Sequence, residues 1–175
     1  MKKIETLAKT KWVALNRITY PEMNIQGYDY LHEVRTNGQG LLVLPYRIVN
    51  GKREFLLRIE LCPAWNTEQH FVCGLTGGVE NNDPLQSAVT EVEEETGYVV
   101  DASEMIALGT CFGNKNTDTT YHLYSVDLTD KVAGEAVGDG NPEEEIATSI
   151  WKTNFDDCVD SLVHIAFYKL VRMNK

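Results

Sequence analysis

The sequence predicts an α+β sandwich in which a mixed β-sheet is combined with few helices. Segments rich in β-branched and aromatic residues outnumber the segments with helical periodicity. Hairpin and turn signals join them, in place of the regular strand and helix alternation of a doubly wound sheet. The chain has 175 residues, of which 43% are hydrophobic, and this suits one domain with a sizeable core.

The N-terminal region is predicted to form an antiparallel strand pair. Residues 12–20 and 27–36 both alternate loosely between apolar and polar side chains, which is the period of a β-strand. Residues 21–26, which begin with a proline, would connect the two strands. This pair precedes the core of the fold.

The strongest hairpin signal follows it. Residues 40–49 and 54–61 are rich in Leu, Ile, Val, Phe and Tyr, and they flank Asn50 and Gly51. Asn-Gly favours the two-residue turn whose twist matches that of paired strands. We therefore expect these two segments to be adjacent antiparallel strands.

Two helices are expected in the rest of the chain. Asp83 and Pro84 are typical of an N-cap and a first helical residue, and Gly97 of the residue just past a helix end, which predicts a helix over residues 84–96. Residues 160–173 have apolar side chains at helical spacing and should close the fold as an amphipathic helix. Further strands are expected in four runs: 71–75, 105–112, 120–128 and 146–152.

Composition excludes several classes of partner. The net charge is -10 and the isoelectric point is about 4.8, which argues against non-specific nucleic-acid binding because that requires a basic surface. No apolar run reaches the roughly 20 residues that a membrane-spanning helix needs, and the first residues lack the apolar segment of a signal peptide. We expect a cytoplasmic protein without a membrane partner.

The four cysteines give no sign of a metal site or of a disulfide framework. Cys62, Cys73, Cys111 and Cys158 have no C-x-x-C spacing, and no export signal is recognised. We therefore expect reduced thiols, most of them buried.

The predicted helix over residues 84–96 is unusually acidic. Glu91, Glu93, Glu94 and Glu95 stand within five positions, and like charges at helical spacing cost about 0.2 to 0.5 kcal/mol per pair. At 100° per residue, three of these glutamates share one face, and Glu93 points elsewhere. The other stripe of the helix is apolar and would pack on the sheet: Leu85, Ala88, Val89 and Val92.

Two interpretations of this face remain open. Acidic residues at helical spacing are commonly a solvated surface. Alternatively, the face binds one or two hard divalent cations, since Mg²⁺ and Mn²⁺ prefer oxygen ligands. Gly77 and Gly78, about a dozen residues earlier, favour the second interpretation because glycine permits close backbone approach to a ligand.

These residues carry a resemblance to a known family. Seven positions resemble the signature G-x5-E-x7-R-E-U-x-E-E-x-G-U of the Nudix hydrolases, where U is a bulky apolar residue: Gly78, Glu91, Val92, Glu94, Glu95, Gly97 and Tyr98. Three features depart from it. Asn82 replaces the first glutamate, Thr90 replaces the arginine, and only three residues separate Gly78 from Asn82 instead of five.

The resemblance implies a fold and a chemistry. The fold would be a Nudix-type α/β/α sandwich with a mixed sheet. Mg²⁺ or Mn²⁺ would be bound by Glu91, Glu94 and Glu95, with the backbone carbonyl of Gly78 as a further ligand, and Glu94 and Glu95 would be catalytic. A metal-activated water would attack the diphosphate of a nucleoside diphosphate. Because the family's arginine orients a catalytic glutamate, Thr90 raises the alternative of weakened catalysis.

A second acidic cluster comprises Glu143, Glu144 and Glu145. It is either a solvated loop or, as in related sugar-nucleotide diphosphatases, a segment that supplies a general base or an extra metal ligand. We take Glu144 as the candidate catalytic residue of this cluster.

The N-terminal strands resemble those of the ADP-ribose diphosphatases. This similarity implies a dimerisation element in residues 1–37, a catalytic domain in residues 38–175, and a homodimer. It makes four side chains candidates for substrate contacts: Arg35, Arg58, Tyr28 and Trp65. Phe112, Gly113 and Asp118 occupy the place where that subgroup has a Pro-Gly pair and a glutamate, which weakens the assignment of the subgroup.

Together, these resemblances imply a Mg²⁺-dependent hydrolase of nucleoside diphosphate sugars. ADP-ribose, cleaved to AMP and ribose 5-phosphate, is the first substrate to test. One alternative is a hydrolase of another nucleotide, such as a damaged triphosphate or a dinucleotide. The other is a catalytically weak module that binds a nucleotide and acts as a sensor, which Thr90 and Asn82 suggest.

Overall fold

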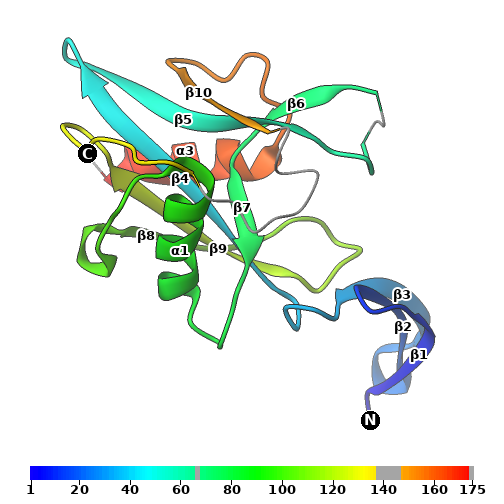
Figure 1. The fold of residues 1–175 in the computed structure, drawn as a ribbon. Helices are drawn as coiled ribbons and strands as arrows, with labels where there is room; N and C mark the ends of the chain where they lie inside the picture. The colour runs from blue at the N-terminus through cyan, green and yellow to red at the C-terminus, as the bar shows by residue number, and fades with distance from the viewer. Residues whose placement is uncertain (66–67, 137–146, 174–175) are drawn as a thin grey trace.

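The computed structural model describes residues 1–65, 68–136 and 147–173. A seven-stranded mixed sheet lies between helix α1 (Pro84–Thr96) on one face and helix α3 (Ser161–Met173) on the other, as Figure 1 shows. The predicted α+β class and the α/β/α layering are confirmed. Within the described residues, no helix combines the length and apolarity needed to cross a membrane.

The central sheet has the strand order β10-β5-β4-β9-β8, with β6 paired to β5 and β7 paired to β4. Only the pair β4 and β9 is parallel, and the other described pairs are antiparallel. The strands are β4 (Gln39–Val49), β5 (Lys52–Leu61), β6 (His70–Cys73), β7 (Leu75–Gly78), β8 (Ile106–Phe112), β9 (Thr120–Asp127) and β10 (Thr148–Lys152). A short 3-10 helix, Ala102–Glu104, precedes β8.

The N-terminal strands form a separate antiparallel sheet that projects from the sandwich (Figure 1). It contains β1 (Lys3–Lys9), β2 (Val13–Tyr20) and β3 (Ile25–Glu33), and a 3-10 turn, Pro21–Met23, links the last two. The predicted strand pair is confirmed as β2 and β3. Strand β1 was not predicted, because all seven of its residues are exposed and no burial pattern marks them.

The central hairpin and the first helix have the predicted local chemistry. Asn50 and Gly51 adopt φ values of 51° and 73°, as the two-residue turn between β4 and β5 requires. The side chain of Asp83 accepts a hydrogen bond from the backbone N–H of Gln86 at the start of α1. Gly97 ends the helix with φ 72°.

Strand β4 is buried on both faces and divides the core into two parts. Its side chains alternate, so Leu41 and Val43 pack toward α1, whereas Leu42 and Leu44 pack toward α3. The predicted apolar stripe of α1 belongs to the first part, with Ala88 and Val92 fully buried and Leu85 and Val89 partly so. On the other face, α3 contributes Val163, Ala166 and Leu170. The inner stripe of α1 is thereby fixed, which directs the opposite side of the helix away from the sheet.

Candidate functional site

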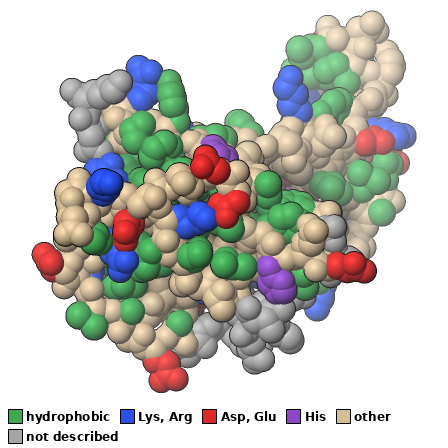
Figure 2. Space-filling view, turned by 90° about the horizontal axis from the view of Figure 1, so that it is seen from above, with side chains coloured by type: hydrophobic (Ala, Val, Ile, Leu, Met, Phe, Trp, Pro, Cys, Tyr) green, Lys and Arg blue, Asp and Glu red, His purple; other side chains and the backbone are tan. Residues whose placement is uncertain are grey.

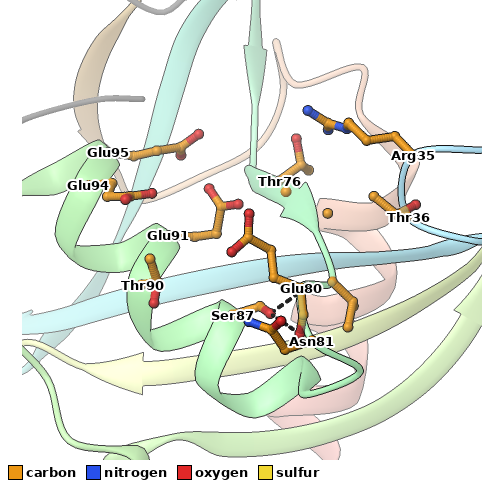
Figure 3. A pocket seen from close by; sticks show the side chains of 13 residues that line it. Arg35, Thr36, Thr76, Glu80, Asn81, Ser87, Thr90, Glu91, Glu94 and Glu95 are labelled. Atoms are coloured by element: carbon orange, nitrogen blue, oxygen red, sulfur yellow. Dashed lines mark hydrogen bonds between the residues drawn. The ribbon is translucent and has the colours of Figure 1, made fainter. Parts of the chain in front are cut away.

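A cavity of about 560 Å³ lies between α1, β7 and the segment that precedes β4. Four carboxylates line it: Glu80, Glu91, Glu94 and Glu95. Figure 3 shows that the carboxylates of Glu80 and Glu91 approach each other, and that Arg35 lies on the opposite side of the cavity. The candidate site is therefore a strongly acidic hollow with one cationic side chain on its rim.

The acidic face of α1 forms as the helical period predicts. Glu91, Glu94 and Glu95 all line the cavity, and each is partly buried. Glu93 is exposed and is not among the residues that line it. Three glutamates are thus directed to one place, although like charges at helical spacing repel each other.

The two glycines of β7 allow the backbone to approach this face. A Cβ atom at Gly77 would collide with the carboxylate of Glu91, so the Glu91 side chain lies directly against the Gly77 backbone. A Cβ atom at Gly78 would collide with the side chain of Thr36. Glycine is therefore needed at both positions for close packing, and neither requires a positive φ.

The loop between β7 and α1 contributes a carboxylate that the sequence analysis missed. Glu80 is exposed to the cavity, and its backbone N–H donates to the Ser87 hydroxyl at 2.9 Å, which holds the loop against the helix. Asn81 and Asn82 turn the chain with φ values of 51° and 57°, a conformation that asparagine tolerates. The sequence signal for Glu80 is its place directly after the Gly-Gly-Val run, outside the helical pattern of residues 84–96.

Arg58 lies beneath the C-terminal turn of α1. It is only 6% exposed, its Nη1 donates to the backbone carbonyl of Glu95 at 2.7 Å, and its Nε lies 3.8 Å from Glu95 Oε2. The structure therefore places Arg58 behind Glu95, and Arg58 is not among the residues that line the cavity. Its position suits the orientation of a carboxylate.

Arg35 is the only lysine or arginine among the described residues that line the cavity. It is exposed, and its guanidinium carbon lies 5.6 Å from the centre of the Trp12 ring. Such stacking holds the arginine stem and leaves the planar donors available to a phosphate. Thr36, beside it, also lines the cavity.

The other predicted substrate contacts lie elsewhere. The hydroxyl of Tyr28 donates to the backbone carbonyl of Lys115 at 2.5 Å and so ties β3 to the loop before β9. Trp65 is 53% exposed and packs edge-on against Phe71 at 5.4 Å between ring centres. Neither lines the cavity within this single chain. Glu144, with Glu143 and Glu145, lies outside the described residues.

The donor set of the cavity suits a hard divalent cation. Four carboxylates offer only oxygen atoms, which are the ligands that Mg²⁺ and Mn²⁺ prefer. The close approach of Gly77 to Glu91 keeps this side of the cavity narrow. Residues Glu80, Glu91, Glu94 and Glu95 therefore fit such an ion.

Comparison with known proteins supports the fold. A solved structure described as the crystal structure of an ADP compounds hydrolase, a Nudix protein, matches with a TM-score of 0.71 at 15% sequence identity. The match covers 98% of this chain and 91% of that one. No protein-family model and no curated protein sequence matches the chain. The fold is therefore Nudix-like, as the sequence signature suggested.

Proposed function

We propose that this protein is a divalent-metal-dependent hydrolase that cleaves the diphosphate linkage of a nucleoside diphosphate sugar, with ADP-ribose as the first substrate. The observation that carries the proposal is the cavity in which four carboxylates meet across from Arg35. A diphosphate repels such a surface unless cations lie between them, so the arrangement suits a substrate that arrives with Mg²⁺. The Nudix-like fold supports the same class of reaction.

Each group in the cavity has a proposed role. Glu91, Glu94 and Glu95 would hold Mg²⁺ or Mn²⁺, together with the backbone carbonyl of Gly78. Bound divalent ions neutralise a diphosphate, lower the pKa of an attacking water and stabilise charge on the leaving oxygen. Arg35 would bind the phosphate oxygens with its planar donors and so orient the diphosphate along the cavity.

Arg58 is a candidate to replace the arginine that the family signature has at the position of Thr90. In the signature that the sequence resembles, an arginine one position before Glu91 orients a catalytic glutamate. Here Arg58, on β5, contacts two groups of Glu95: it donates a hydrogen bond to the backbone carbonyl and forms an ion pair with the carboxylate. We propose that Arg58 supplies the orienting cation from the sheet, which favours a working enzyme over a binding module.

The general base is proposed to be an acidic side chain within reach of the attacking water. Glu144 is the candidate from the sequence, and Glu80 is the candidate within the described part of the chain. Comparing kcat for Glu144→Gln and Glu80→Gln at saturating Mg²⁺ separates the two. The base variant should lose turnover with little change in KM.

The direct test is incubation with ADP-ribose and Mg²⁺, followed by chromatographic detection of AMP and ribose 5-phosphate. The products should appear with Mg²⁺ or Mn²⁺ and should be absent when a chelator is in excess. The same panel should contain other nucleotide sugars, a dinucleotide and oxidised nucleoside triphosphates. If one of these other compounds is the preferred substrate, the protein is still a diphosphate hydrolase, but ADP-ribose is not its substrate. Binding of a nucleotide without release of any product would favour the sensor alternative.

We also propose that the N-terminal sheet joins two copies of the chain. Figure 2 shows this sheet as a lobe that stands apart from the main body, with hydrophobic side chains on its surface. Ile4, Leu7 and Trp12 are 54%, 39% and 51% exposed there. Light scattering should give the mass of a dimer, and Leu7→Lys should shift the population toward monomer; a monomeric unmodified chain would contradict this proposal.

A further inference from the structure

Three side chains of types that ligate metals meet beside the antiparallel pair of strands β5 and β6. Glu60 lies at the end of β5, Cys62 follows that strand, and Cys73 is the last residue of β6. Cys62 Sγ lies 3.7 Å from Cys73 Sγ and 3.9 Å from Glu60 Oε1. One ligand atom from each residue can be chosen so that all three lie within 4.8 Å of one another.

These distances agree with a tetrahedral metal site. Two thiolates at about 2.3 Å from a tetrahedral zinc ion lie about 3.8 Å apart, and a thiolate and a carboxylate oxygen lie about 3.6 Å apart. The observed separations of 3.7 and 3.9 Å differ from these by only a few tenths of an ångström. A disulfide would instead require the two sulfur atoms to approach to about 2.0 Å.

The surroundings of this cluster favour a cation. Cys73 is 2% exposed, and Glu60 and Cys62 are partly buried. Asp160, 6% exposed, lies on the neighbouring segment and accepts hydrogen bonds from the backbone N–H groups of Gly74 and Leu162 at 3.1 and 2.9 Å. The cluster is therefore partly shielded from water and close to a further acidic side chain, Asp160, which favours a bound cation.

We propose that Glu60, Cys62 and Cys73 bind one Zn²⁺ or a similar borderline-soft divalent ion, with the fourth coordination position open to water. Two sulfur ligands select such an ion over Mg²⁺. The ion would join the segment that follows β5 to the last residue of β6. Because β6 leads directly into β7, it would also stiffen the strand that carries Gly77 and Gly78 at the acidic cavity.

The test uses the full chain, reduced with a phosphine, stripped with a chelator and titrated with Cd²⁺. Thiolate coordination gives an ultraviolet charge-transfer absorption that carboxylates alone do not produce, so the acidic cavity does not contribute to it. One equivalent should saturate the signal, and a large excess of Zn²⁺ should compete with the cadmium for the site. Cys62→Ser and Cys73→Ser should weaken binding by about 100-fold or more, and Glu60→Gln by about tenfold.

Cys111→Ser is the matched control, because Cys111 is a partly buried thiol on β8, outside the cluster. It should bind cadmium as the unmodified protein does. Cys62 is not fully buried, so Cys62→Ser remains informative if Cys73→Ser does not fold. The proposal fails if the reduced protein shows no thiolate signal with excess Cd²⁺, or if the signal persists in Cys62→Ser. It also fails if mass spectrometry finds a bond between Cys62 and Cys73 under the same reducing conditions.

Discussion

Two clusters of ligating side chains lie on either side of Arg58, and they differ in the atoms they offer. The cavity at α1 presents carboxylate oxygens from four glutamates, whereas the cluster at the end of β5 presents two sulfur atoms and one carboxylate. Arg58 and Glu60 stand two positions apart on β5 and therefore face the same side of the strand. One strand thus connects an open, hard-ligand site with a mostly buried, softer one.

The two clusters differ mainly in their donor atoms, and the donor atoms, more than the charge, determine which metal ion each cluster suits. Both clusters contain a carboxylate, so the presence of an acidic group alone does not say which ion each would bind. Oxygen ligands with an open cavity suit Mg²⁺ that is shared with a phosphate, whereas sulfur ligands suit an ion that remains in the protein.

Glu94→Gln should abolish most hydrolysis while leaving cadmium binding at the thiols unchanged. Loss of one carboxylate from the cavity removes a proposed metal ligand, and we expect kcat to fall by about 1,000-fold. Glu93→Gln is the control, since Glu93 is the adjacent exposed glutamate outside the cavity. It should retain full activity in the same assay. Equal losses in both variants would contradict the assignment of the cavity.

The features that sequence alone predicted are those with local signals. The Asn50-Gly51 turn, the caps at Asp83 and Gly97, and the common direction of the three cavity glutamates on α1 depend on residues within a few positions of one another. Each of these predictions is confirmed. Strand β1 was missed because all of its residues are exposed, and the parallel pairing of β4 with β9 was not predicted because it joins segments far apart in the sequence.

The features that sequence missed depend on pairing across the fold. Cys62 and Cys73 are eleven positions apart with no metal-binding spacing, and they meet only once the chain has turned back after β5 and paired β6 with it. The contact of Arg58 with Glu95 likewise spans 37 positions and joins a strand to a helix. Such long-range contacts leave no periodic pattern in the sequence. A motif alone therefore cannot show that Arg58 takes over the role of the missing arginine, as we propose.

Arg58→Met tests whether the residue between the two sites serves the cavity. Removing one partner of a buried ion pair leaves the other charge uncompensated, and the free energy of unfolding should fall by about 3 kcal/mol in denaturant titrations. Arg58→Lys keeps the charge but loses the planar guanidinium donors. Its free energy of unfolding should lie between those of Arg58→Met and the unmodified protein. Arg17→Met removes the better-formed but exposed pair with Asp29, at 2.7 Å, and should change stability little.

Activity distinguishes positioning from a merely structural role for Arg58. If Arg58 orients Glu95, kcat should fall in Arg58→Met at a temperature where the variant is fully folded, while KM changes less. In the Glu95→Gln background the same substitution should have a smaller further effect, because the oriented charge is already gone. Additive losses in the double variant would contradict a role of Arg58 in orienting Glu95.

Gly77→Ala should displace a ligand without unfolding the chain. The added methyl group would occupy the place of the Glu91 carboxylate, which is the mobile end of a side chain and can move aside. A shift of about 1 Å in a catalytic group can reduce turnover by about 100-fold. Gly27→Ala, where a Cβ atom would meet only ordinary contacts at 3.4 Å, is the control and should behave as the unmodified protein. Full activity of Gly77→Ala would contradict a role for Glu91.

Thermal shifts give the smallest expected effect and the sharpest separation of the two sites. An ion that binds only the folded chain, at about five times its Kd, stabilises by about 1 kcal/mol, which corresponds to about 3 °C in Tm for a chain of this length. The shift with Mg²⁺ should disappear in Glu94→Gln and persist in Cys62→Ser. The shift with one equivalent of Zn²⁺ should do the reverse. If either substitution removed both shifts, the two clusters would act as one site, and the distinction between oxygen and sulfur ligands would no longer assign them separate roles.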